Sequence, residues 1–148
     1  MRPGWLRGAS AGRAGGTMIV EERLFDTGAL FDLYKGRQRA RAYLDRLLGG
    51  SLRGYISVVS EAEMWRGLRP DEVEDHEALL ELFVVLPLDS RPAQLAGAWM
   101  QRYEGEGLGW MDALIVATAR QAGLTVLTRD GRLAACLTDE AQFEVYGS

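Results

Sequence analysis

Four acidic residues stand at places where an apolar run ends and a helix or turn is expected to begin. They are Asp26 in RLFDTGALFDLYKG, Glu63 in ISVVSEAEMWRGL, Asp112 in GWMDALIVATA and Asp130 in VLTRDGRL. A carboxylate at the end of a buried strand or at the start of an apolar helix is costly to desolvate. Carboxylates that converge repel one another and partly protonate, unless a divalent cation neutralises them. The pattern therefore predicts a metal-dependent site built from these four acids.

The ligand chemistry of such a site points to a particular reaction class. Carboxylate oxygens select Mg2+ or Mn2+, and the single His and single Cys of the chain give little support to zinc. Such ions can hold a phosphodiester, lower the pKa of a bound water and stabilise the leaving oxygen. We therefore expect phosphodiester hydrolysis. Thr27 and Thr128 flank two of the acids and could orient a ligand or water, although helix capping and strand propensity explain them equally well.

Each acid also has an ordinary structural explanation. Asp26 could cap the helix that begins in TGALFDL, and Asp112 could cap ALIVATARQ. Ser60 and Glu63 match a capping box, in which each side chain accepts a backbone N–H. Asp130 followed by Gly is an ordinary turn pair. Taken singly these explanations are the simpler ones, so the case for a site depends on whether the four acids share one edge of the fold.

Short β-rich runs alternate with helical patterns along the chain. The expected strands are Arg23–Asp26, Tyr55–Val59, Phe83–Leu86, Thr125–Thr128 and Phe143–Tyr146. This alternation predicts a parallel sheet with helices on both faces, and the runs ISVV, FVVL and TVLT are typical of strands buried on both sides. Asp26, Glu63 and Asp130 follow strands, which places them at the carboxyl edge of the sheet, where ligands bind. Asp112 begins the helix before the 125–128 strand, so its placement there is a further assumption.

The length of 148 residues is enough for one domain with a substantial core. We expect that domain at 18–148. Residues 1–17 are rich in Gly, Ala and Arg, lack acids and periodicity, and are expected to form a disordered extension. No apolar stretch approaches the roughly 20 residues that a membrane-spanning helix needs. Cys136 is the only cysteine, which excludes an internal disulfide and fits a reducing cytoplasm.

The net charge of −4 is not typical of a nucleic-acid-binding protein, but one stretch is strongly basic. Its cationic residues are Lys35, Arg37, Arg39, Arg41, Arg46 and Arg53. This stretch could follow phosphates, or it could be the solvated face of a helix, which is the simpler interpretation. His76, the only histidine, lies in the acidic run DEVEDHEALLE and is expected to be a solvated helix residue.

Together, the four motifs resemble the PIN domain family and, within it, the VapC-type ribonuclease toxins of VapBC toxin–antitoxin systems. FDTGALFDLYKG resembles the family's opening strand with its first Asp, and ISVVSEAEMWRGL resembles the second motif with Glu63. GWMDALIVATARQAGLTVLTRD covers the third and fourth motifs, with Asp112 and Asp130. The resemblance runs in the family's order from about residue 22 to the C-terminus, and the pair DALIVATA and LTRD carries it most strongly.

The resemblance implies a three-layer α/β/α domain with a mainly parallel sheet. It implies Mg2+- or Mn2+-dependent endoribonuclease activity, with the four acids as catalytic metal ligands. It also implies an RNA substrate, a homodimer and a small antitoxin protein that silences the toxin. Asp32 and Glu61 lie near two of the motifs but do not match the metal positions, and we expect them on the surface or on a helix face.

Two other classes of protein are alternatives. A PIN fold with residual acids could be a non-catalytic module that binds RNA or protein. A phosphatase or a receiver domain fits less well. A haloacid-type phosphatase needs Asp-x-Asp at the first strand, where this chain has Asp26, Thr27 and Gly28. A receiver domain needs a lysine near the final strand, and the only lysine is Lys35.

Overall fold

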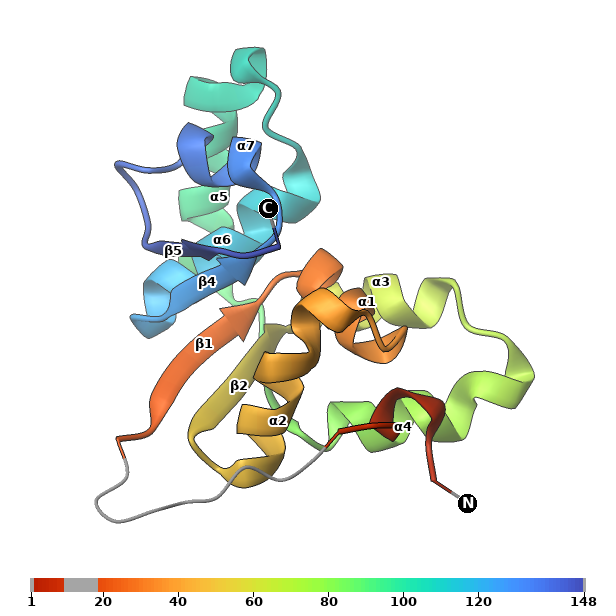
Figure 1. The fold of residues 1–148 in the computed structure, drawn as a ribbon. Helices are drawn as coiled ribbons and strands as arrows, with labels where there is room; N and C mark the ends of the chain where they lie inside the picture. The colour runs from red at the N-terminus through yellow and green to blue at the C-terminus, as the bar shows by residue number, and fades with distance from the viewer. Residues whose placement is uncertain (1, 10–18, 148) are drawn as a thin grey trace.

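The computed structural model describes residues 2–9 and 19–147, which include a single parallel sheet (Figure 1). Its five strands are β1 (Glu21–Phe25), β2 (Leu52–Ser57), β3 (Phe83–Leu86), β4 (Thr125–Thr128) and β5 (Phe143–Val145). Their order across the sheet is β3-β2-β1-β4-β5, and every neighbouring pair is parallel. The parallel sheet predicted from the alternation of elements is confirmed.

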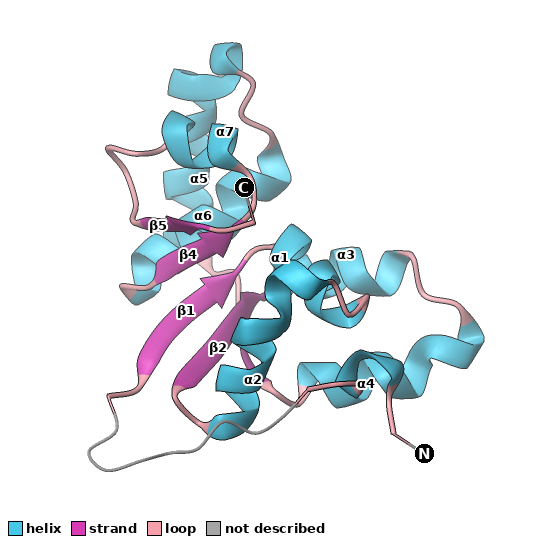
Figure 2. Ribbon diagram, in the orientation of Figure 1, coloured by secondary structure: helices cyan, strands magenta, loops and turns pink. Residues whose placement is uncertain are grey.

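Helices follow the strands and form the outer layers (Figure 2). They are α1 (Thr27–Tyr34), α2 (Arg41–Gly49), α3 (Val58–Arg66), α4 (Val73–Leu80), α5 (Ser90–Tyr103), α6 (Trp110–Ala122) and α7 (Gly131–Cys136). The arrangement is the expected three-layer α/β/α fold. In the described part of the chain, no helix combines the length and the apolar character that crossing a membrane requires.

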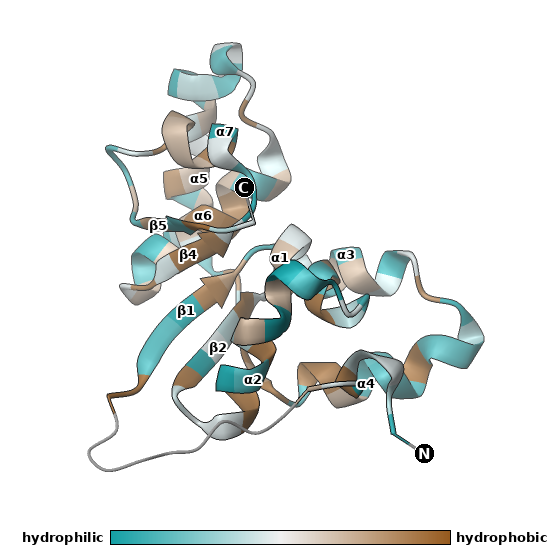
Figure 3. Cartoon of the chain, in the orientation of Figure 1, coloured by the Kyte–Doolittle hydropathy of each residue, from teal (hydrophilic) through white to brown (hydrophobic). Residues whose placement is uncertain are grey.

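The two faces of the sheet carry separate apolar cores. Leu24 and Val126 point into the core made with α5 and α6, while Phe25 and Leu127 point into the core made with α1, α2 and α4. Successive strand residues point to opposite faces, which is why the C-terminal end of β1 and the middle of β4 are continuously apolar. Figure 3 shows these segments in brown, whereas the exposed first half of β1 is teal.

The start of α3 differs from the prediction. The strand expected at Tyr55–Val59 ends at Ser57, because the Ser57 hydroxyl accepts the backbone N–H of Val59 at 3.0 Å and caps α3. The proposed capping box with Ser60 as the cap is therefore wrong, and both Ser60 and Glu63 lie inside α3. The earlier helix start moves Glu63 from the expected first turn to the second turn of α3.

The third strand has the predicted bounds but not the predicted burial. Val84 and Val85 point to opposite faces of β3, yet they are 46% and 36% exposed. β3 is the edge strand of the sheet, and the helices that cover the central strands leave its middle open. The expectation that FVVL is buried on both faces is therefore wrong, while Leu127 and Val126 in β4 satisfy it.

The N-terminal segment is not wholly the disordered extension expected over 1–17. Gly4–Leu6 form a turn of 3-10 helix, and Trp5 is only 5% exposed. The Trp5 indole Nε1 donates to the carbonyl oxygen of Asp75 at 3.0 Å, and its ring belongs to the core that includes α1 and α4. Residues 10–17 lie outside the described residues, and the division into 1–17 and 18–148 stays a prediction.

The docking of Trp5 gives a stability prediction. Trp5→Ala is expected to lower the free energy of unfolding by about 2 kcal/mol, less than the roughly 3 to 5 kcal/mol of an interior Trp, because the released segment regains conformational entropy. Urea unfolding measures the change. Trp110→Ala is the control, since Trp110 is 53% exposed. Equal stability of the wild type and the Trp5→Ala variant would contradict the docking of this segment.

Candidate functional site

The strand order changes direction between β1 and β4, with β2 and β3 on one side and β5 on the other. In open parallel sheets, ligands bind beyond the carboxyl ends of the strands at such a point. Asp26 follows β1 directly, and its backbone N–H donates to the carbonyl oxygen of Leu127 in β4 at 3.1 Å. Asp26 therefore lies where the strand order reverses.

The Asp26 carboxylate is almost fully buried and is held through both oxygens. Oδ1 accepts the backbone N–H of Ala29 at 2.9 Å, which caps α1, and Oδ2 accepts the hydroxyl of Thr128. Burial raises the pKa of Asp26, and the two hydrogen bonds partly oppose that rise. The Asp26 side chain is therefore held in one position, and burial makes its negative charge unfavourable.

Glu63 reaches the same edge from α3. The Thr27 hydroxyl at the start of α1 donates to Glu63 Oε1 at 2.6 Å, and Thr27 Oγ1 is also 3.0 Å from the buried hydroxyl of Ser60. These contacts join the first turn of α1 to α3. Thr27 therefore orients Glu63, a predicted metal ligand. The sequence alone did not distinguish this role of Thr27 from helix capping.

Asp130 caps α7 and is linked to Asp26 through Thr128. Asp130 Oδ1 accepts the backbone N–H groups of Arg132 at 3.0 Å and Leu133 at 3.1 Å. The Thr128 hydroxyl oxygen accepts the backbone N–H of Asp130 at 2.9 Å while it donates to Asp26. One buried hydroxyl thus positions two of the acids.

Asp112 lies in the first turn of α6, whose N-cap is Gly109, so the predicted capping by Asp112 is wrong. Within the described residues, its carboxylate makes no hydrogen bond. Burial is the larger cause of a raised pKa at Asp112, which reaches about 6. The negative charges of Asp26, Asp130 and Glu63 are the further causes. The other three acids therefore lie close enough to Asp112 to act on its charge.

An acidic pocket of about 400 Å³ is lined by three of the four acids, Asp26, Asp112 and Asp130, together with Gly28 and Arg129. The described residues contain no group of three or more Asp, Glu, His or Cys side chains already arranged to hold a metal ion. The donors nevertheless fit Mg2+ or Mn2+, since they are hard oxygens under mutual repulsion. A cation would relieve that repulsion without breaking any hydrogen bond of Asp112.

The geometry of the four predicted acids is clear, and their role as metal ligands stays a prediction. All four lie near the carboxyl edge, including Asp112, whose placement was an assumption. Capping a helix does not exclude a residue from this pocket, because Asp26 and Asp130 each cap a helix and also line the pocket. Sequence reasoning missed Arg129, which lines the pocket and directly precedes Asp130.

Asp32 lies on a face of α1, as one of the two expected positions allows, but that face is buried and not at the surface. It is 3% exposed and accepts hydrogen bonds from Arg39 Nε at 3.0 Å and from the Tyr146 hydroxyl at 2.8 Å. Arg129 Nε forms an ion pair with the same carboxylate at 3.3 Å. Glu61 does lie on a helix face, where it accepts from Trp65 Nε1 at 3.2 Å.

His76 is also buried rather than solvated, at 2% exposure. Its ring lies edge-on to Tyr34, with centroids 4.3 Å apart, and 5.8 Å from Trp65. Burial lowers the pKa of His76, and its Nδ1 has no hydrogen-bond partner among the described residues. These ring contacts give His76 a packing role between α1, α3 and α4, and His76 does not line the acidic pocket.

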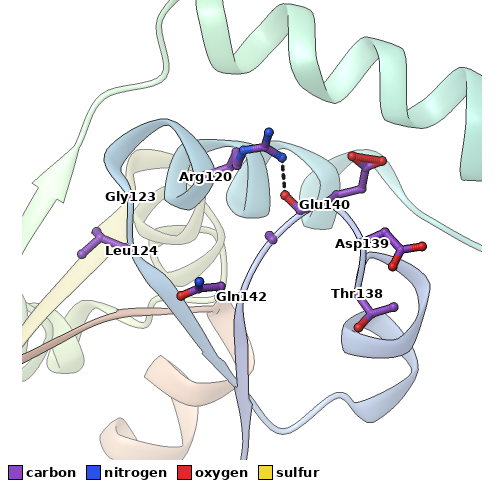
Figure 4. Close-up of a pocket in the computed structure, with 8 residues that line it drawn as sticks. Arg120, Gly123, Leu124, Thr138, Asp139, Glu140 and Gln142 are labelled. Atoms are coloured by element: carbon purple, nitrogen blue, oxygen red, sulfur yellow. Dashed lines mark hydrogen bonds between the residues drawn. The ribbon is translucent and has the colours of Figure 1, made fainter.

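A second pocket, of about 480 Å³, lies at the opposite end of β4 (Figure 4). It is lined by residues around Gly123 and Leu124, just before β4, and by the 138–142 segment. The Arg120 guanidinium donates to the carbonyl oxygen of Glu140 across its mouth. The pocket lies at the amino end of the strand, so the four acids do not reach it.

Comparison with known proteins gives one family match. The model of the PIN domain family matches residues 23–136. A toxin–antitoxin complex from Klebsiella pneumoniae is similar at 25% identity and a TM-score of 0.65, over 83% of this chain and 96% of the other. FitAcB from Neisseria gonorrhoeae is similar at 28% identity and 0.63, over 82% and 96%. VapBC2 from Rickettsia felis, bound to a promoter DNA fragment, shares the fold at 18% identity and 0.71, over 85% and 99%. No curated protein sequence matched.

Proposed function

The chain belongs to the PIN domain family, whose model matches most of its length, and we propose that it is a metal-dependent endoribonuclease acting as the toxin of a toxin–antitoxin pair in the cytoplasm. The observation that carries the proposal is the set of four carboxylates at the switch point of the sheet. Burial and the three neighbouring acids together raise the pKa of Asp112 to about 6. Such an arrangement is unfavourable for stability and is typical of a site that a cation completes.

In this proposal, Asp26, Glu63, Asp112 and Asp130 hold one or two Mg2+ or Mn2+ ions. The bound metal supplies charge neutralisation at the phosphodiester and a water of lowered pKa. The protein supplies position. The Thr128 hydroxyl fixes Asp26, the Thr27 hydroxyl fixes Glu63, and two backbone N–H groups of α7 fix Asp130. Asp112 makes no hydrogen bond within the described residues, so it is the side chain that can turn toward the ligand.

Metal removal tests the proposal directly. We expect cleavage of a fluorescent RNA to stop in excess EDTA and to return with Mg2+ or Mn2+. Independently of cleavage, millimolar Mn2+ is expected to raise the midpoint of thermal unfolding by roughly 5 °C, because a ligand that binds only the folded state stabilises it. The Asp112→Asn variant should lose most of this shift. RNA binding without cleavage at any metal concentration would instead support the non-catalytic module.

The proposed partners are suggested by structures that the chain resembles, which include a toxin–antitoxin complex and a member of the VapBC family of toxin–antitoxin systems. We propose that a small antitoxin protein binds and silences this chain, and that the chain forms a homodimer. Co-expression with the product of the adjacent reading frame should relieve growth arrest and yield a co-purifying complex. Sedimentation of the purified chain at micromolar concentration should give the mass of two copies, and a monomer would contradict the proposed dimer.

A further inference from the structure

A basic pocket of about 280 Å³ adjoins the acidic pocket that Asp26, Asp112 and Asp130 line. Its cationic lining comes from Lys35, Arg37, Arg39 and Arg129. The two pockets are neighbours, because Gly28 of α1 and Arg129, which follows β4, line both of them. The basic stretch seen in the sequence is thus divided by the fold. Its first three cations line this pocket, whereas Arg46 pairs with Glu21 at the amino end of β1.

The pocket is built on a buried anchor. Asp32 holds Arg39 through Nε and Nη2, at 3.0 and 3.2 Å, and holds Arg129 through Nε at 3.3 Å. Both arginine side chains remain about two fifths exposed, at 38% and 42%. A guanidinium carries five N–H donors, so each arginine keeps donors beyond those that Asp32 engages. Asp32 therefore fixes both arginine side chains and leaves guanidinium N–H groups that can bind an anion.

The other two cations are exposed. Lys35 Nζ lies 5.6 Å from the centroid of the Phe31 ring, and the backbone N–H of Arg37 donates to the carbonyl oxygen of Asp32 at 2.9 Å. These contacts hold the end of α1 and the turn after it against the pocket. With one carboxylate against four cations, the lining has an excess of about three positive charges, in a chain whose net charge is negative.

Gly28, which lies between the two pockets, has no conformational or packing reason to be a glycine. Its φ is not in the left-handed region, and an added Cβ would meet only Asp26 Oδ1, at the ordinary contact distance of 3.7 Å. Gly in a helix costs up to about 1 kcal/mol relative to Ala. Neither the backbone conformation nor close packing requires a glycine there. Its lack of a side chain keeps the space open between the acidic and the basic pocket.

We propose that this basic pocket binds a backbone phosphate of the RNA, next to the phosphate that is cleaved at the four acids. The proposal rests on the proposed ribonuclease function. It gives the substrate two contacts of opposite character: the phosphate that is cleaved lies at the acids, which would hold the metal, and a neighbouring phosphate is held directly by arginine and lysine. Arginine suits such a site because its planar fork matches the oxygens of a phosphate.

Binding is measured apart from cleavage. A short fluorescent single-stranded RNA is titrated by anisotropy into the cleavage-deficient Asp112→Asn protein, with and without Lys35→Gln and Arg37→Gln. The matched control carries Arg53→Gln and Arg102→Gln, which remove the same charge at side chains 61% and 70% exposed. We expect the pocket variant to raise the Kd about tenfold and to reduce the slope of log K against log salt by about 1, with little change in the control.

Equal losses in the pocket variant and the control would mean that only diffuse charge acts, and would overturn the proposal. So would unchanged RNA affinity in the pocket variant accompanied by lost binding of a polyglutamate peptide, which would assign the pocket to an acidic protein segment. A wild-type protein that cleaves no RNA would refute the proposed function instead. The same two substitutions in the protein with an intact Asp112 give a second measurement. There we expect KM for RNA cleavage to rise and kcat to stay nearly unchanged.

Gly28→Leu tests the connection between the pockets without changing any charge. Leu is a better helix former than Gly, so the midpoint of thermal unfolding should stay the same or rise. RNA affinity should fall by about tenfold, because the new side chain occupies the space that joins the two pockets. Gly97→Leu in α5 is the control, since a Cβ there meets nothing within 4 Å. Full RNA affinity in a folded Gly28→Leu protein would contradict the proposed connection between the two pockets.

Discussion

Replacing Asp112 by Asn is expected to lower the rate of RNA cleavage by at least about a thousandfold while leaving the protein folded. Asn keeps the shape of the side chain but removes the negative charge that a cation requires. Asp112 makes no hydrogen bond within the described residues, so the substitution breaks no bond that holds the fold. The loss of activity can therefore be attributed to the site and not to unfolding.

The measurement is single-turnover cleavage of a fluorescent RNA in Mg2+, with circular dichroism as the check on folding. Asp71→Asn is a matched control, because the Asp71 side chain is 77% exposed and pairs only with a surface arginine at 3.7 Å. Retained cleavage by the Asp112→Asn protein would defeat the mechanism, since no other substitution removes a carboxylate of the site at so small a structural cost.

The same substitution is expected to stabilise the metal-free protein. The pKa of Asp112 is raised from 3.8 to about 6, so the folded state binds a proton more tightly than the unfolded state. The charged form therefore costs stability, and that cost develops as the pH rises from about 4 to about 6. In EDTA at pH 7.5, Asp112→Asn should raise the free energy of unfolding by about 1 to 2 kcal/mol after allowance for solvent screening. Near pH 4 the two proteins should unfold alike.

The parts of this site that the sequence predicts are those set by local rules. A carboxylate after an apolar strand lies at the carboxyl edge of a parallel sheet, whichever residues surround it, and Asp26 and Asp130 follow this rule. Helix starts were less predictable, because Ser57 and Ser60 both suit an N-cap and the choice depends on where β2 stops pairing with β3. That pairing ends at Ser57, opposite Leu86, and the helix begins there.

The parts that the sequence does not predict depend on contacts between distant segments. Asp32 is buried because Tyr146 and Arg129 reach it from the other end of the chain, and no feature of the FDLYKG motif shows this. The same holds for His76, whose acidic neighbours suggest a solvated helix while its own ring faces Tyr34. Burial of a polar side chain is a property of its partners, which local patterns do not contain.

The two interpretations that competed for each acid turn out to be compatible at Asp26 and Asp130. At Asp130, the backbone N–H groups of Arg132 and Leu133 both donate to Oδ1, so the cap orients the side chain and does not use Oδ2. Capping a helix can therefore orient a carboxylate, and it does not exclude that carboxylate from a metal-binding site. For these residues, a loss of stability on substitution cannot by itself distinguish a structural role from a catalytic one, which is why Asp112 is the sharper test.

Asp32→Asn is expected to have the opposite effect on stability, lowering the free energy of unfolding by about 2 to 3 kcal/mol at pH 7. Removing one partner of a buried ion pair costs roughly 3 to 5 kcal/mol, and the partial exposure of Arg39 and Arg129 reduces that figure. The variant leaves the two guanidinium groups without the carboxylate that separates them, and it weakens the acceptor of the Tyr146 hydroxyl.

The pH dependence distinguishes this carboxylate from those of the site. Although burial acts to raise it, the pKa of Asp32 is lowered, because hydrogen bonds from Arg39 and Tyr146 and the charges of two arginines outweigh the burial. Asp32 therefore contributes stability that is present above the unfolded pKa near 3.8 and is lost as the pH falls through the lower folded value.

The deficit of Asp32→Asn should persist from pH 7 to pH 4.5, whereas the gain of Asp112→Asn should already shrink between pH 6 and pH 4. Urea unfolding at these pH values, with Asp139→Asn as a surface control, measures both. A deficit that fades between pH 6 and pH 4.5 would mean that Asp32 is not held by its arginines.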